Sequence, residues 1–259
     1  MKELLSIVIN YRTENLLNNF IESYMKYVDS PDRTLVVGDV ASNNMSSTIN
    51  LPDGVGFYGW VDNIGYAKAV NQIADMYKDH KYKNIAIFNA DTMFVNSECV
   101  DSCLSLLNSD DKIAIVGPLQ YDSYGRVTHA GIIGTNSKPI HRSWHSKNLS
   151  DLSYVSESIS VSGSAFFIKR SIWDELANDE QYKEIDPDSR GAFLNTDLYY
   201  EETWCCYFAR HKGYKVMYNG EASMIHEWDS SPNSELTSKI KESREMFRKA
   251  CDHIGIEHE

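Results

Sequence analysis

The sequence predicts an α/β protein in which a mainly parallel central sheet is flanked by helices. Its first half alternates short apolar segments with segments of helical periodicity, a pattern typical of parallel sheets with helical connections. Ile85 to Phe88 is an unbroken apolar run, as expected of a strand that is buried on both faces. Polar residues directly follow the predicted strands, at the sheet edge where open α/β sheets bind their ligands.

The elements of the first half follow one another without an internal repeat or a low-complexity linker. Strands are expected at Leu4–Ile9, Thr34–Val37, Ile85–Phe88 and Lys112–Val116. Three helices are expected between them: one after Thr13 as N-cap, one beginning near Asn63 and one near Ser97–Leu107. The apolar faces of the first two consist of Leu16, Leu17, Phe20, Ile21, Tyr24 and Val28, and of Ile64, Ala67, Val70, Ile73 and Tyr77.

From Gly117 the sequence changes to shorter polar segments punctuated by glycine, which predict hairpins. The expected elements are then a strand within Tyr154–Lys169, a helix at Ser171–Ala177, a polar loop at Asp179–Asn195, a helix at Tyr199–Lys212 ended by Gly213, and a strand at Tyr214–Tyr218. An amphipathic helix closes the chain, with Leu236, Ile240, Phe247, Ala250 and Ile254 on its apolar side. We therefore expect one domain at residues 1–230, in halves 1–117 and 118–230, and a helix at 231–259 packed on it.

Composition and charge exclude several classes of protein. The 259 residues are 42% hydrophobic, enough for a packed core, and no apolar run approaches the roughly 18 residues of a transmembrane helix. Asp and Glu number 37 against 25 Lys and Arg, and the net charge of -12 argues against broad binding to nucleic acid or anionic membrane. The start of the chain lacks a signal peptide pattern, and five cysteines without CxxC spacing fit reduced thiols in a cytoplasmic protein.

Asn89 and Asp91 form the first candidate site. They lie two residues apart just past the central strand, so strand alternation would point both side chains the same way. A hard cation such as Mg2+ or Mn2+ takes one or two protein carboxylates and completes its coordination with water and phosphate oxygens. The pair therefore indicates a divalent metal site, although Asn-Ala-Asp is also an ordinary turn sequence. Asp39 follows the second strand in the same way and has the same two interpretations.

Glu201 and Glu202 form a second acidic element, in the first turn of a predicted helix. One of them could act as a general base, but acidic residues are also favourable at any helix N-terminus. Gly65 and Ala67, at the start of an earlier helix, suit a close approach of the backbone to an anionic ligand. His226 follows a short apolar segment and, taken alone, is more often a surface or core residue than a ligand.

Seven segments of the chain match one family in order and spacing. They are SIVINYRTENLL, VVGDVASNN, NIGYAKAVNQ, FNADTMF, VSGSAFFIKR, YYEETWCCYFARHKGYKV and the terminal His226. In these segments, from about Leu5 to His226, the chain resembles the family 2 inverting glycosyltransferases of the GT-A fold. The resemblance is strongest to the rhamnosyltransferase-like branch, which makes surface polysaccharide.

The resemblance implies a nucleotide-sugar donor in the half at 1–117 and a glycan or other hydroxyl-bearing acceptor in the half at 118–230. Donor-binding residues would be Tyr11, Arg12, Asp39, Asn63, Gly65, Asn71 and Asn89. Asp39 would contact the nucleotide base, a contact that favours UDP- or dTDP-sugars. Asp91, in a DXD-type motif, would hold Mn2+ or Mg2+ with help from Asn89 and His226. The catalytic base would be Glu202 or Glu201, with Glu202 favoured because it aligns with the family's usual Asp.

Three residues depart from the family's pattern and keep a second interpretation open. The chain has Glu202 where Asp is usual, Trp204 where a second Asp is frequent and Phe208 where a basic residue is common. The alternative is a sugar-nucleotide or glycan-binding module whose acidic site has decayed. Three other enzyme classes are less consistent with the sequence. A nucleotidyltransferase needs a glycine-rich basic loop after the first strand and a dehydrogenase needs a GxGxxG motif, and the sequence has neither. A glycosidase needs two carboxylates flanking the scissile bond, and the resemblance argues against that class. Asp197 is the next candidate for the base.

Overall fold

A computed structural model of the chain describes residues 1–40, 49–227 and 236–259. Its strands are β1 (Lys2–Asn10), β2 (Arg33–Val40), β3 (Gly56–Trp60), β4 (Tyr82–Asn89), β5 (Thr92–Met93), β6 (Ile113–Tyr121), β7 (Val127–His129), β8 (Ile132–Thr135), β9 (Lys138–His141), β10 (Val155–Glu157), β11 (Ala165–Lys169) and β12 (Lys215–His226). Its helices are α1 (Glu14–Tyr27), α2 (Tyr66–Met76), α3 (Glu98–Asn108), α4 (Arg170–Ala177), α5 (Glu180–Ile185), α6 (Glu201–His211) and α7 (Leu236–Ile254), with 3-10 turns at Lys78–His80 and Ser150–Leu152.

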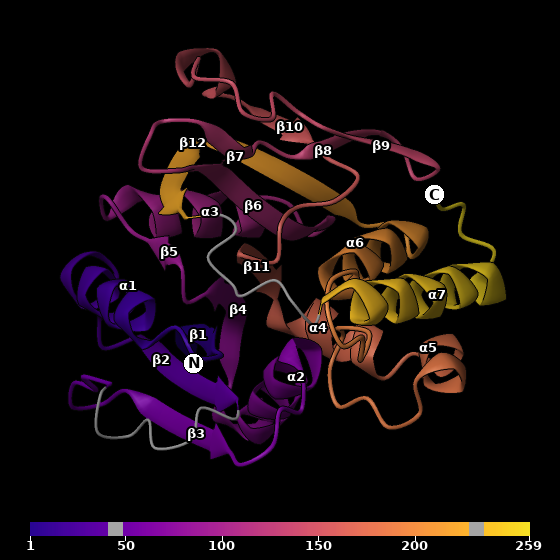
Figure 1. The fold of residues 1–259 in the computed structure, drawn as a ribbon, viewed down its shortest axis with the longest axis horizontal. Helices are drawn as coiled ribbons and strands as arrows, with labels where there is room; N and C mark the ends of the chain where they lie inside the picture. The colour runs from indigo at the N-terminus through magenta and orange to yellow at the C-terminus, as the bar shows by residue number, and fades with distance from the viewer. Residues whose placement is uncertain (41–48, 228–235) are drawn as a thin grey trace.

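The central sheet has ten strands in the order β10-β12-β6-β11-β4-β1-β2-β3, with β5 paired to β12 and β7 paired to β6 (Figure 1). β1 is parallel to β2 and β4, β2 to β3, and β6 to β12. β11 runs antiparallel between β4 and β6. Because β4 and β6 both run opposite to β11, the carboxyl ends of β1, β2, β4, β6 and β12 lie at the same edge of the sheet. β8 and β9 form a separate antiparallel hairpin.

Helices cover both faces of the sheet and enclose two hydrophobic cores (Figure 1). Successive residues of β1 alternate between the cores, as the period of two in a strand requires: Ile7 lies in one core and Val8 in the other. α1 and α3 cover one face, where Phe20 and Phe88 pack with ring centroids 5.5 Å apart. α2, α4 and α6 cover the other face, to which α7 adds Phe247. Burial of these apolar side chains is the main stabilising term.

The structure confirms the predicted α/β class and corrects several predicted elements. β3 lies where the sequence analysis predicts no strand, because a five-residue segment with two glycines carries little strand signal. The predicted polar loop Asp179–Asn195 contains α5, whose N-cap Asp179 accepts hydrogen bonds from the backbone N–H groups of Gln181 and Tyr182. The antiparallel strand β11, which pairs with both β4 and β6, agrees with a mainly parallel sheet that has a smaller antiparallel portion.

Two further corrections concern segments near the candidate site. β12 is one strand of 12 residues that reaches His226, whereas the sequence predicts two shorter segments; the register shift between Asn219 and Ser223 hides their continuity. Thr13 precedes α1 but its side chain makes no capping hydrogen bond. Its hydroxyl and its N–H instead donate to Asn10 Oδ1, at 2.9 and 3.2 Å.

The last predicted domain boundary, between residues 230 and 231, lies outside the described residues. Within the described ranges α7 begins at Leu236 and packs against α5 and α6. In the same ranges, no helix is both long and apolar enough to cross a membrane.

Candidate active site

The turn after β4 places Asp91 beside His226. Asn89 ends β4, and its carbonyl oxygen accepts a hydrogen bond from Thr92 Oγ1 at 2.8 Å, which tightens the Asn89–Thr92 turn. The short strand β5 then pairs antiparallel with the end of β12, with Thr92 opposite His226. The backbone N–H of Glu227 donates to the Asp91 carbonyl at 3.0 Å and fixes the same junction. The Asp91 carboxylate and the His226 imidazole, 135 positions apart in the sequence, therefore lie side by side.

The Asp91 and His226 side chains fit a divalent cation. Asp91 Oδ1 lies 3.6 Å from His226 Nε2, too long for a hydrogen bond but short enough for one ion to contact both. Burial lowers the pKa of His226, so its imidazole is neutral and has a lone pair for a metal. The described residues hold no cluster of three or more His, Cys, Asp and Glu side chains suited to a metal. Two protein ligands nevertheless suffice for Mg2+ or Mn2+, which complete their coordination with water and phosphate oxygens.

The first turn of α6 holds Glu201 and Glu202, which point about 100° apart because 3.6 residues make one helical turn. Glu201 is buried, and its Oε2 accepts a hydrogen bond from Thr196 Oγ1 at 3.1 Å. Burial and the neighbouring Glu202 raise the pKa of Glu201 to about 8, so Glu201 is largely protonated at neutral pH. The helix begins after two left-handed residues, Tyr199 and Tyr200, with φ of 63° and 73°. Such strained backbone is often found at functional sites.

Glu202 has a different environment from its neighbour. Its residue is half-buried, and its Oε2 atom is shielded from solvent without a hydrogen-bond partner among the described residues. Burial raises its pKa, and the backbone N–H groups of Glu202, Thr203 and Gly163 act in the opposite direction. A Cβ atom at Gly163 would lie 3.4 Å from Glu202 Cγ, so the glycine lies directly against this side chain.

Tyr66 connects the two acidic elements. Its hydroxyl donates a hydrogen bond to the Gly163 carbonyl at 3.1 Å. The pKa of Tyr66 is raised well above its ordinary value, chiefly by burial and then by the carboxylates of Glu201, Glu202 and Asp91. The carboxyl groups of both predicted acidic elements therefore lie close enough to Tyr66 to act on its pKa.

The carboxyl ends of β1 and β2 form the neighbouring part of the site. Asn10 and Asp39 are opposite one another in the sheet, and Asn10 Nδ2 donates to Asp39 Oδ1 at 2.7 Å. Asp39 is buried. Tyr11 and Arg12 follow directly, and the Arg12 guanidinium lies 5.1 Å from the centroid of the Tyr11 ring. Arg12 is exposed and has a left-handed backbone with φ of 58°, so it places a positive charge at this edge of an acidic protein.

Asn63 and Gly65 shape the entry to α2. The Gly65 N–H donates to Asn63 Oδ1 at 3.0 Å, and Gly65 has φ of 87°, a conformation that other residues rarely adopt. A Cβ at Gly65 would lie 3.8 Å from the Thr196 carbonyl oxygen and 3.9 Å from Asp197 Cα. The start of α2 therefore lies beside the segment that leads to α6. Asp197 itself is exposed.

Asn71 lies deeper in the molecule, on the buried side of α2, with 1% of its surface exposed. Its Nδ2 donates to Ser189 Oγ, the Phe193 carbonyl and Asn195 Oδ1, at 3.2, 2.7 and 3.0 Å. Its Oδ1 accepts from the Phe193 N–H at 3.2 Å. These bonds fix the loop before α6 to α2. The direct donor contact predicted for Asn71 stays a prediction, as do those of Asn63 and Gly65.

Four residues at this site are not among the predicted site residues. They are Tyr66, Gly163, Gln120 and His129. Tyr66 and Gly163 lie inside the segments NIGYAKAVNQ and VSGSAFFIKR, so their place in a matched segment was the available signal. Gln120 and His129 lie outside all matched segments, and only strand pairing brings them here, opposite one another in β6 and β7.

Trp204 and Phe208, which depart from the family's pattern, are core residues. Both are fully buried, and their rings stack with centroids 5.1 Å apart at an angle of 16°. Tyr182 of α5 packs against both rings, at 5.7 and 6.1 Å. The departures therefore serve the contact between α6 and α5, on the side of α6 that faces the core.

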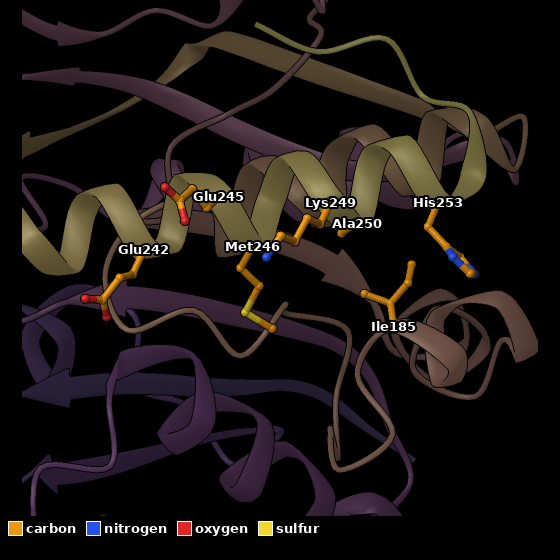
Figure 2. A pocket seen from close by; sticks show the side chains of 7 residues that line it. All are labelled: Ile185, Glu242, Glu245, Met246, Lys249, Ala250 and His253. Carbon is orange, nitrogen blue, oxygen red and sulfur yellow. The ribbon is translucent and has the colours of Figure 1, made fainter.

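A pocket of 380 Å³ lies elsewhere, between α5 and α7 (Figure 2). Its lining includes the apolar side chains of Ile185 and Met246 and the charged side chains of Glu242, Glu245 and Lys249. None of the predicted site residues lines it. Its volume alone does not connect it to the carboxylates around Tyr66.

Comparison with known proteins decides the fold. No protein-family model and no curated protein matches the sequence. The mannosyltransferase PcManGT from Pyrobaculum calidifontis, solved in complex with GDP-Man and Mn2+, is similar in structure with a TM-score of 0.62 at 14% identity, over 96% of this chain and 64% of that one. GalNAc-T7 with UDP, GalNAc and Mn2+ has a TM-score of 0.65 at 15% identity, over 91% of this chain and 46% of that one.

This chain has the GT-A glycosyltransferase fold. The GT-A fold is the one that the sequence resemblance implies, with its mostly parallel sheet and a smaller antiparallel portion. The chain spans less than two thirds of the length of either similar structure.

Proposed function

We propose that this protein is an inverting glycosyltransferase. It moves a sugar from a nucleoside-diphosphate sugar, with UDP- or dTDP-sugars favoured, to a hydroxyl group of a glycan or similar acceptor. The observation that carries the proposal is the placement of Asp91 beside His226, and of Glu202 against the Gly163 turn that Tyr66 holds, at the carboxyl edge of a GT-A sheet. The two similar structures, solved with GDP-Man or UDP and with Mn2+, support a metal-assisted reaction of this class.

The donor binds at the carboxyl ends of β1, β2 and β4 in this proposal. Asp39 accepts a hydrogen bond from the N–H of a uracil or thymine ring, and Asn10 orients its carboxylate through the 2.7 Å bond. Tyr11 and Arg12 flank the nucleotide, and the guanidinium offsets part of the negative charge of the diphosphate. Asn63, Gly65, Asn71 and Asn89 line or support the same donor site.

Asp91 and His226 would hold Mn2+ or Mg2+ together with the diphosphate oxygens. The ion supplies charge neutralisation for the leaving diphosphate. Because the protein carries a net charge of -12, such local positive charge is needed for an anionic donor to bind.

Glu202 is the catalytic base in the proposed reaction. Its carboxylate takes the proton of the acceptor hydroxyl while that oxygen bonds to the anomeric carbon. The bond from the anomeric carbon to the diphosphate oxygen breaks on the opposite face, and its electron pair leaves with the nucleoside diphosphate. Glu202 suits this role better than Glu201, because Glu201 is largely protonated at neutral pH and accepts a hydrogen bond from Thr196.

The alternative of a decayed binding module rests on Trp204 and Phe208. Both rings are buried in the contact between α6 and α5, and this packing explains why the two positions differ from the family's pattern. The two differences therefore do not require a loss of catalysis. We further propose the rhamnosyltransferase-like branch, a role in polysaccharide biosynthesis and a cytoplasmic location. The five cysteines, all buried free thiols, support a reducing compartment.

The test is a donor screen with the purified protein. A panel of UDP-, dTDP- and GDP-sugars is incubated with Mn2+, and the release of nucleoside diphosphate is measured with and without excess chelator. We expect slow, chelator-sensitive hydrolysis of one UDP- or dTDP-sugar. Donor binding without release in any member of the panel would favour the binding module instead, and a preference for a GDP-sugar would refute the assignment of Asp39.

A further inference from the structure

The turn at Ser162–Ser164 is held from several parts of the candidate site. The backbone N–H of Ser162 donates to His129 Nε2 at 3.2 Å, and Ser164 Oγ donates to Gln120 Oε1 at 2.6 Å. The Asn89 N–H donates to the Ser164 carbonyl at 3.2 Å, which connects the turn to the end of β4. These contacts come from neighbouring strands of the sheet.

The hydrogen bond from Tyr66 to Gly163 has a different origin. Tyr66 begins α2, 97 positions before Gly163, and its ring stacks on Phe193 with centroids 6.5 Å apart at 25°. The ring is therefore supported by the loop before α6, and its hydroxyl reaches the turn from α2, outside the sheet. Gly163 in turn lies against Glu202, since an added Cβ would be 3.4 Å from Glu202 Cγ.

We propose that Tyr66 is a positioning residue for Glu202: by holding the Gly163 carbonyl it fixes the Ser162–Ser164 turn against the Glu202 side chain. This inference rests on the proposed function for the role of Glu202 as base. Tyr66 does not itself exchange a proton with the substrate. It links the start of α2 to the carboxylate that receives the acceptor proton.

The anchoring is tested first without any assay of activity. Tyr66→Phe removes the hydroxyl and keeps the ring on Phe193. Hydrogen exchange of peptides that span Ser160–Phe166 is compared between this variant and the full-length wild type. We expect faster exchange in the variant and an unchanged rate in Tyr82→Phe, a control that loses a 2.8 Å bond to Thr34 at the other end of β4. Unchanged exchange in Tyr66→Phe would overturn the proposal.

The positioning role is tested by measuring kcat and the donor Kd separately. In Tyr66→Phe we expect kcat to fall about 3- to 10-fold, the range for one lost hydrogen bond, with an unchanged Kd for the donor nucleotide. In a Glu202→Gln background the same substitution has no further effect on kcat, because the group that it positions is gone. A higher Kd with unchanged kcat, or an equal fall in both backgrounds, would refute the proposal.

These outcomes separate the inference from the proposed function. Faster exchange of the turn in Tyr66→Phe, in a protein that transfers no sugar from any donor, would refute the proposed function and leave the anchoring by Tyr66 supported. Transfer by the wild type with no change in either exchange or kcat in Tyr66→Phe would refute the inference alone.

Discussion

The two sides of the candidate site hold their polar groups in different ways. At the ends of β1 and β2, the Asn10 side chain donates to Asp39 and accepts two hydrogen bonds from Thr13, so these groups are fixed by protein partners. On the other side, formed by the carboxyl end of β12 and the first turn of α6, Glu202 Oε2 and His226 Nδ1 are buried without a hydrogen-bond partner among the described residues.

In the proposed function, this difference separates donor binding from catalysis. Buried polar groups without partners cost stability, on the order of 1–3 kcal/mol each, whereas paired groups cost little. Left-handed backbone at Tyr199 and Tyr200 adds strain on the same side. The β1–β2 side therefore has the properties of a preorganised binding surface, and the β12–α6 side has those of a reactive one with shifted pKa values.

Substitution of Asp91 tests the reactive side most severely. Asp91→Asn removes the carboxylate of the proposed metal pair and should reduce Mn2+-dependent turnover to background. Turnover is measured with saturating donor, and calorimetry measures Mn2+ binding in the presence of UDP. Asp53→Asn, in an exposed loop, is the matched control. Normal turnover of Asp91→Asn, or full wild-type activity in excess chelator, would remove the metal from the mechanism.

The second-largest fall in activity is expected from loss of the proposed catalytic base. Glu202→Gln should lower kcat by about 10² to 10⁴, the usual contribution of a positioned general base, and leave donor affinity unchanged. Steady-state transfer and donor Kd are measured for this variant and for Glu201→Gln, which differs by one position in the same helical turn. If both variants transfer at nearly the wild-type rate, the base lies elsewhere, and Asp197 is then the next residue to test.

The binding side should respond in KM rather than in kcat. Asp39→Ala removes a charged hydrogen-bond acceptor, and we expect the donor KM to rise about 10- to 100-fold with a smaller change in kcat. Initial rates over a range of donor concentrations give both constants. A fall confined to kcat would show that Asp39 belongs to the reactive side and would break the comparison.

The smallest effect on activity is expected from substitution of Glu201, which should instead change how stability depends on pH. Its pKa is raised from 4.5 to about 8 in the folded protein, so the unfolded chain ionises first and stability falls as pH rises between these values. Glu201→Gln removes the ionisable group and therefore this loss of stability with rising pH. We expect a higher melting temperature than wild type above pH 8, a smaller difference below pH 4.5, and little change in kcat at neutral pH. An equal difference at both pH extremes would contradict the raised pKa.

The sequence by itself determined the alternating elements and, to within three residues, the carboxyl ends of β1, β2 and β4. β2 runs on to Val40, so Asp39 lies near the end of this strand and not after it. Apolar runs at β1, β2 and β4 are local patterns, and a parallel sheet brings their carboxyl ends to one edge whatever the rest of the chain does. That rule is enough to place Asp39, Asn89 and Asp91 near one another. It explains why the predicted fold class is confirmed and why these three residues lie at one edge of the sheet.

Only the tertiary structure decided which groups face one another. The pairing of β5 with β12 sets His226 beside Asp91, and the bond from Tyr66 to Gly163 connects α2 to the turn against Glu202. These contacts join positions about a hundred or more residues apart, so no local pattern contains them. Burial also raises the pKa values of Glu201 and Glu202, because solvent exclusion is a property of the packed molecule and not of the residue.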